Sequence, residues 1–176
     1  GKNPKIAVCG ITLTFLQKTL TGAIEQVLRN TKSTYKFDKK SNIIYIGNVE
    51  LLLLPIEDES TIFGYDVACA YVDELDELPT HTCIAVVKAL NDRCRQAIID
   101  EPRSPFLAFT TTSQGLKGTY QTIMNFRKIG MSYMIIRGRT RDNIYLQKEY
   151  VDAMYKMYNE KETKCLLEGE FISIDS

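Results

Sequence analysis

Two adjacent carboxylates directly follow a short apolar run in the middle of the chain. The residues from Val67 to Val72 are all apolar or aromatic, and Asp73 and Glu74 come next. Such a run, with β-branched and aromatic members, is typical of a buried strand in a parallel sheet. Ligands of open α/β sheets bind at the carboxyl ends of these strands. At such an edge Asp73 could hold Mg²⁺, and Glu74 could orient or deprotonate a water that attacks a nucleotide phosphate.

Hydroxyl side chains follow the next apolar run in the same way. Thr110, Thr111, Thr112 and Ser113 come directly after a predicted strand over residues 106–109. In a parallel sheet these hydroxyls would emerge beside the two carboxylates, where they could sense a γ-phosphate and shift when it leaves. The alternative is that the acids are solvated residues at a strand end, and that Thr and Ser follow the preferences of strands and turns.

Three arginines alternate further along the chain, at Arg137, Arg139 and Arg141, in a stretch without acids. In an extended segment all three side chains would face the same way. They could contact a DNA backbone, or complete a neighbouring subunit's ATP site as an arginine finger. A solvated rim explains each of them equally well.

Composition excludes several other classes of protein. Lys plus Arg equals Asp plus Glu at 22 each, so bulk charge favours no particular partner. The five cysteines form no C-x-x-C pair and there is one histidine, which predicts reduced thiols in a cytosolic setting rather than a zinc site or a disulfide framework. No apolar run approaches the length of about 18 residues that a membrane span needs. A G-x-x-x-x-G-K-[ST] phosphate loop is also missing from the 176 residues.

Strand and helix patterns alternate along the chain and must position these side chains. Apolar runs predict strands over residues 6–9, 42–46, 49–54, 67–72, 106–109 and 131–136, the second and third joined by a Gly47-Asn48 hairpin turn. Apolar residues at helical spacing predict helices over 13–27, 80–98, 119–129 and 146–158, and the polar residues 29–41 predict a surface connection. This alternation indicates a mostly parallel sheet with helices on both faces.

In this order the segments resemble the ATPase domain of the large terminase subunit, the motor that packages viral DNA. Asp73-Glu74 is similar to that family's Walker B pair, and the run from Phe109 to Ser113 is similar to its coupling motif. Further similar segments cover most of the chain: Ile6 to Leu28, Val49 to Gly64, Asp142-Asn143 with Leu146 and Tyr150, and Leu167 to Phe171.

The resemblance implies a P-loop-type ATPase of the additional-strand class, a three-layer α/β sandwich incomplete at its N-terminal edge. Residues 1–140 would be the ATPase core after the phosphate loop, and 141–176 a C-terminal helix and linker toward a nuclease domain. Asp73 would bind Mg²⁺, Glu74 would activate water for ATP hydrolysis, and Thr110, Thr111 and Thr112 would couple hydrolysis to movement on DNA. The family often carries a basic residue near the Gly before Walker B, whereas Thr61-Ile62-Phe63-Gly64 offers none.

The implied function is ATP-driven translocation of double-stranded DNA into a procapsid. The implied partners are DNA, a portal protein, a small terminase subunit and further copies in a ring, in the host cytoplasm and without a membrane. Two alternatives stay open. One is a helicase-like nucleic-acid ATPase, and the other is a non-hydrolysing interaction module with the same fold. The missing phosphate loop favours the second for this chain alone, which we expect to be inactive by itself.

Overall fold

A six-stranded open sheet organises the molecule, in the order β2-β3-β4-β1-β5-β6. The structure is a computed structural model, and it describes residues 3–57, 59–96 and 106–173. The strands are β1 (Lys5–Gly10), β2 (Tyr35–Asp38), β3 (Ile43–Ile46), β4 (Val49–Pro55), β5 (Cys69–Val72) and β6 (Phe106–Phe109). The β4, β1, β5 and β6 strands run parallel to one another, and β2, β3 and β4 pair antiparallel. The predicted mostly parallel α/β sheet is therefore confirmed.

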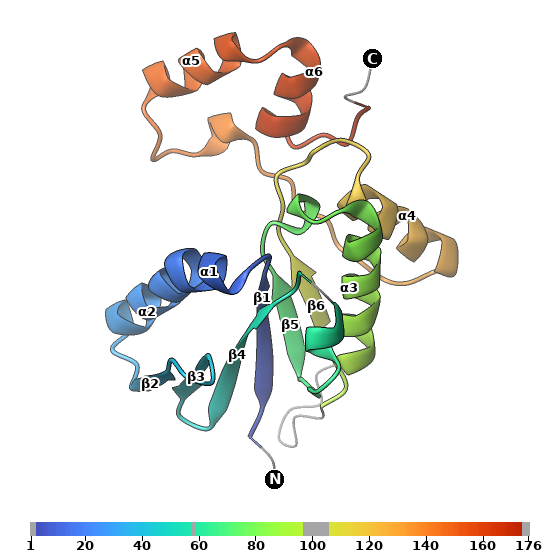
Figure 1. Ribbon diagram of the computed structural model, residues 1–176. Helices are drawn as coiled ribbons and strands as arrows, with labels where there is room; N and C mark the ends of the chain where they lie inside the picture. Colours follow the sequence, from blue (N-terminus) through green and yellow to red (C-terminus); the bar gives the residue numbers. More distant parts are fainter. Residues whose placement is uncertain (1–2, 58, 97–105, 174–176) are drawn as a thin grey trace.

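Helices cover both faces of this sheet (Figure 1). On one face a continuous helical run comprises α1 (Leu13–Phe15), the π-helical turn η1 (Leu16–Leu20) and α2 (Thr21–Asn30). Leu16 and Leu28 of this run pack with Val8, Ile44 and Leu53 of the strands. On the other face lies the larger cluster of buried residues, under α3 (Thr80–Arg93) and next to α4 (Gly118–Ile129). The parallel strands are therefore packed between two apolar layers, one on each face of the sheet.

The chain leaves β1 through a turn that requires glycine. A Cβ atom at Gly10 would lie 2.9 Å from Leu16 Cδ2 and 2.9 Å from Phe15 Cδ1, closer than real Cβ contacts. The Thr12 side chain then accepts a hydrogen bond of 3.0 Å from the Phe15 N–H, so Thr12 is the N-cap of the helical run. The helix therefore starts directly beside the carboxyl end of β1.

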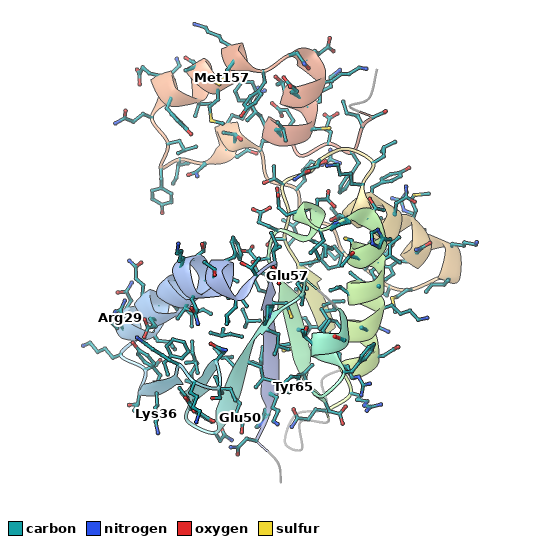
Figure 2. The ribbon with its side chains drawn as sticks, viewed as in Figure 1. Arg29, Lys36, Glu50, Glu57, Tyr65 and Met157 are labelled. Atoms are coloured by element: carbon teal, nitrogen blue, oxygen red, sulfur yellow. The ribbon has the colours of Figure 1, made fainter. Side chains whose placement is uncertain are left out.

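A separate group of short helices lies over the carboxyl ends of the parallel strands (Figure 1). We call residues 139–173 the C-terminal lobe; it contains η4 (Thr140–Asp142), α5 (Lys148–Met157), α6 (Glu160–Glu162) and η5 (Thr163–Leu167). Figure 2 shows Met157 on the outer side of this lobe, and its side chain is 77% exposed. Among the described residues, no helix is long and apolar enough to cross a membrane.

Three expectations about secondary structure are wrong or incomplete. The segment 131–136 forms no strand: it has no ladder partner, and Met134 and Ile136 are 82% and 83% exposed. A β-rich composition gives a strand only where a neighbouring strand supplies hydrogen bonds. The surface connection 29–41 contains β2, which pairs with β3. The helix expected over 80–98 ends at Arg93, and Ile98 lies outside the described residues.

Candidate active site at the carboxyl edge of the sheet

The two acids lie at the carboxyl end of β5, as the sequence predicts. The Asp73 N–H donates to the Cys9 carbonyl at 3.0 Å, which ties the strand end to β1. The β6 strand ends alongside, where the Thr110 N–H donates to the Val72 carbonyl at 2.9 Å. Figure 2 shows Glu57, which follows β4, toward this end of the sheet and Glu50 at the opposite end. The parallel register therefore brings the acids and the threonines together.

Asp73 is held by two hydroxyls through a single carboxylate oxygen. The Thr110 hydroxyl donates to Asp73 Oδ1 at 2.7 Å, and the Tyr71 phenol donates to the same oxygen at 2.9 Å. Burial raises the pKa of Tyr71, and the hydrogen bond to the Asp73 carboxylate raises it further. The phenol therefore stays protonated at neutral pH and remains a donor. Tyr71 was not among the predicted site residues, although its place two residues before Asp73 on a strand puts both on one face.

Glu74 adopts a left-handed backbone conformation, with φ of 53° and ψ of 53°. This region costs about 1 kcal/mol or more for a residue with a Cβ atom, and such strain is concentrated at functional sites. Glu74 is the N-cap of the 3₁₀ helix η3 (Leu75–Glu77), so the chain turns away from the direction of β5 at this residue. The Glu74 carboxylate then accepts a hydrogen bond of 3.2 Å from the Thr112 N–H. Backbone geometry therefore brings this carboxylate back over the sheet edge, toward the loop that follows β6.

Asp76 proves to be a buried structural acid rather than a solvated one. Its side chain is 2% exposed, and Oδ1 accepts a hydrogen bond of 2.7 Å from the Thr119 N–H in the first turn of α4. The Asp76 N–H donates to the Thr111 hydroxyl at 3.0 Å, and Oδ2 accepts a longer contact of 3.4 Å from the Gln114 N–H. Asp76 thus joins η3, the loop 110–115 and α4, with the N-terminal dipole of α4 facing its charge.

The arrangement fits a divalent cation held mainly through a bound phosphate. Asp73 Oδ2 accepts no hydrogen bond from the described residues, so it is open to a ligand. The described chain holds no group of three or more His, Cys, Asp or Glu side chains that could bind a metal alone. Mg²⁺ is commonly bound in this way, by one or two carboxylates, substrate phosphates and water. Asp73 could supply such a carboxylate, and Glu74 follows it in the sequence.

The three alternating arginines do not all lie in one extended segment, because η4 begins at Thr140 and contains Arg141. Arg139 makes a bidentate ion pair with Asp142, at 2.8 Å for both contacts. Arg141 pairs with Glu168 and lies over the Tyr155 ring, 4.7 Å from its centroid. Arg137 is exposed and has no ion pair or side-chain hydrogen bond with any residue that the structure describes. It is therefore the free guanidinium of the three.

A cavity of about 300 Å³ separates the loop 110–115 from the C-terminal lobe. Thr111, Thr112 and Ser113 line one side of it, and Arg139 and Asn143 belong to the other. Ser113 is buried, and its hydroxyl donates to the Glu170 carbonyl at 2.8 Å. The loop that contacts both acids is therefore hydrogen-bonded directly to the C-terminal lobe.

Comparisons with known proteins give a consistent result for the fold. No protein-family model and no curated protein sequence matches the chain. Among solved structures, the large terminase of a thermophilic bacteriophage in complex with ADP superposes with a TM-score of 0.75 and 15% identity, over 98% of this chain and 41% of that one. The large terminase ATPase domain of Thermus phage P74-26 matches with a TM-score of 0.60 and 12% identity, over 97% and 78% of the two chains.

The chain has the fold of a large-terminase ATPase domain. The HK97 bacteriophage large terminase also matches, with a TM-score of 0.60 and 13% identity, over 95% of this chain and 39% of that one. The chain spans about two fifths of the length of the HK97 protein and of the terminase solved with ADP. The predicted resemblance is thereby confirmed for the fold.

Proposed function

We propose that this chain is part of the ATPase motor of a viral DNA-packaging terminase, and that Asp73 and Glu74 form its hydrolytic pair. The observation that supports this most strongly is the meeting of both acids with the loop 110–115 at the carboxyl edge of the sheet. One large terminase with this fold, from a thermophilic bacteriophage, is known in complex with ADP and with ATP-γ-S. A nucleotide at this edge would place its terminal phosphate between the acids and the threonines.

In the proposed site each side chain has a separate role. Mg²⁺ bound with ATP would neutralise charge that develops on the transferred phosphoryl group, and Asp73 Oδ2 would hold it. Glu74 would accept a proton from the attacking water or orient it, from a backbone position that the turn into η3 fixes. The Thr112 N–H donates a hydrogen bond to Glu74, so a movement of this carboxylate during hydrolysis would also move the loop 110–115. Ser113 would carry any shift of that loop to the C-terminal lobe through its bond to Glu170.

The remaining expectations belong to the assembled motor. Double-stranded DNA, a portal protein, a small terminase subunit and a homo-oligomeric ring are the proposed partners, at a procapsid in the host cytoplasm. Arg137 is the best candidate for a contact to DNA or to a neighbouring subunit's nucleotide, because Arg139 and Arg141 are already paired within the lobe. A guanidinium without internal partners can offer two parallel N–H groups to a phosphate without first breaking an ion pair.

One observation favours a second candidate, a non-hydrolysing interaction module. The 176 residues contain no phosphate-loop motif, and the backbone N–H groups and lysine of that loop cradle the phosphates in this class. A helicase-like ATPase would share the Walker B and coupling arrangement but unwind DNA.

A strand-displacement comparison separates these functions. A longer natural polypeptide containing this chain, supplied with ATP, should displace a third strand from triplex DNA without unwinding the duplex. Unwinding of the duplex would identify the helicase-like alternative. Absence of both activities, together with absence of nucleotide binding, would leave the interaction module.

A further inference from the structure

Three side-chain oxygens form a closed triangle at the end of β5. Tyr71 Oη and Thr110 Oγ1 lie 2.9 Å and 2.7 Å from Asp73 Oδ1, and they lie 2.9 Å from each other. Each corner comes from a strand or its end: Tyr71 from β5, Asp73 from the residue after β5, and Thr110 from the residue after β6. The Tyr71 ring packs against the apolar cluster under α2, which holds the phenol in place.

The protons available to this triangle decide how its bonds are arranged. The phenol and the hydroxyl carry one proton each, and the ionised carboxylate carries none, so only two of the three contacts hold a proton at a time. Hydrogen bonds to an ionised acceptor are about twice as strong as neutral ones, so both protons point to Asp73 Oδ1. Oδ1 then accepts two hydrogen bonds, whereas Oδ2 accepts none from the residues that the structure describes.

We propose that Tyr71 and Thr110 are positioning residues that fix the Asp73 carboxylate by Oδ1 and present Oδ2 to a divalent cation. The inference rests on the proposed function, in which a cation accompanies the nucleotide at Asp73. A freely rotating carboxylate would lose rotational freedom on binding the cation, whereas one held by two hydroxyls has already lost it. Because Thr110 begins the loop 110–115, the same bond links the cation site to that loop.

The test is Mn²⁺ binding to a longer natural polypeptide that contains this chain, with a non-hydrolysable ATP analogue bound, measured by the electron paramagnetic resonance signal of free Mn²⁺. Asp73→Asn defines the part of the binding that depends on Asp73. Tyr71→Phe and Thr110→Val each remove one hydroxyl with little change of volume, and Tyr45→Phe is the matched control, since Tyr45 lies on β3 of the same sheet. Removal of a group that supports a metal ligand typically weakens binding by about 10- to 100-fold.

We expect each single variant to weaken the Asp73-dependent binding by about 3- to 10-fold, because one hydroxyl remains, and the double variant by about 10- to 100-fold. Tyr45→Phe should leave it unchanged. Unchanged or tighter binding in both single variants would overturn the inference, because the hydroxyls would then be spectators or competitors of the cation. Absence of any Asp73-dependent binding would overturn it as well. Circular dichroism spectra and melting curves establish that each variant is folded.

ATP turnover distinguishes the failure of this inference from the failure of the proposed function. If a longer natural polypeptide hydrolyses ATP and the two hydroxyl variants bind Mn²⁺ normally, the inference is wrong and the function stands. If Mn²⁺ binding falls as expected and no ATP is hydrolysed, Tyr71 and Thr110 still position Asp73, and the hydrolytic function is wrong. In an active protein, Tyr71→Phe should also raise the Mg²⁺ concentration needed for half-maximal turnover by about the same 3- to 10-fold.

Discussion

Replacement of Asp76 by Ala should destabilise the protein strongly, although this residue is one of four acids between Asp73 and Glu77 and the sequence gives it no special role. The substitution removes a 2.7 Å hydrogen bond from the Thr119 N–H and a 3.4 Å contact from the Gln114 N–H. Loss of a helix N-cap costs about 0.5–2 kcal/mol, and a buried donor left without a partner costs about 1–3 kcal/mol. Relief of the desolvated charge offsets part of this, so we expect a loss of about 2–4 kcal/mol.

Urea unfolding followed by circular dichroism measures this loss. With a slope of about 2 kcal/mol per molar urea, the midpoint should fall by about 1–2 M. Asp76→Asn keeps one acceptor and should lose about half as much. Glu77→Ala is the matched control: Glu77 is exposed, and among the described residues its side chain accepts a hydrogen bond from the Gln114 amide alone, at 2.5 Å, so the loss of stability should stay within about 0.5 kcal/mol. An equal effect of both Ala substitutions would refute the assignment of Asp76 as the cap of α4.

Three further outcomes follow from packing, burial and pairing. Gly118→Ala should destabilise by about 1–3 kcal/mol, because its Cβ would lie 2.3 Å from Cys83 Sγ, whereas Gly22→Ala faces open space on α2 and should stabilise by up to about 1 kcal/mol; urea midpoints check both. Burial raises the pKa of Cys9 to about 12, so its stabilising contribution is complete below pH 9 and is lost as the pH rises toward 12; Cys9→Ala should flatten this alkaline fall in the urea midpoint. Arg137→Ala should leave the urea midpoint unchanged. If this side chain contacts DNA, the substitution should also reduce the slope of log K for DNA binding against log salt concentration by about 1.

Much of the fold could be predicted because its signals are local. Apolar runs of strand length located β1, β5 and β6, and Gly47-Asn48 located the β3–β4 hairpin. The order of the strands is set by packing between distant segments, so the pattern alone predicts only a parallel sheet. Segment 131–136 shows the limit most clearly, since its residues favour a strand but a ladder partner is required as well.

Residue types and their positions in the sequence were enough to locate the candidate site. They did not predict the contacts that its residues make with distant parts of the chain. The acids and threonines were placed correctly because both follow apolar strands of one parallel sheet. Asp76 was not among the predicted site residues, and it caps a helix that begins 42 residues later in the chain. Lys117, the N-cap residue of α4, has no side chain that can accept a hydrogen bond from the first turn, which indicates that the cap must come from elsewhere in the chain. The left-handed conformation of Glu74 left no trace in the sequence.

ATP turnover with and without the Glu74→Gln substitution tests the central claim most directly. The measurement compares this chain and a longer natural polypeptide that contains it, each with Glu77→Gln as the control for removal of a nearby charge. We predict turnover in the longer protein that Glu74→Gln abolishes and Glu77→Gln preserves, with little or none in this chain alone. Turnover that survives Glu74→Gln, or no turnover and no ATP binding in either form, would contradict the assignment of the β5 acids as a hydrolytic pair.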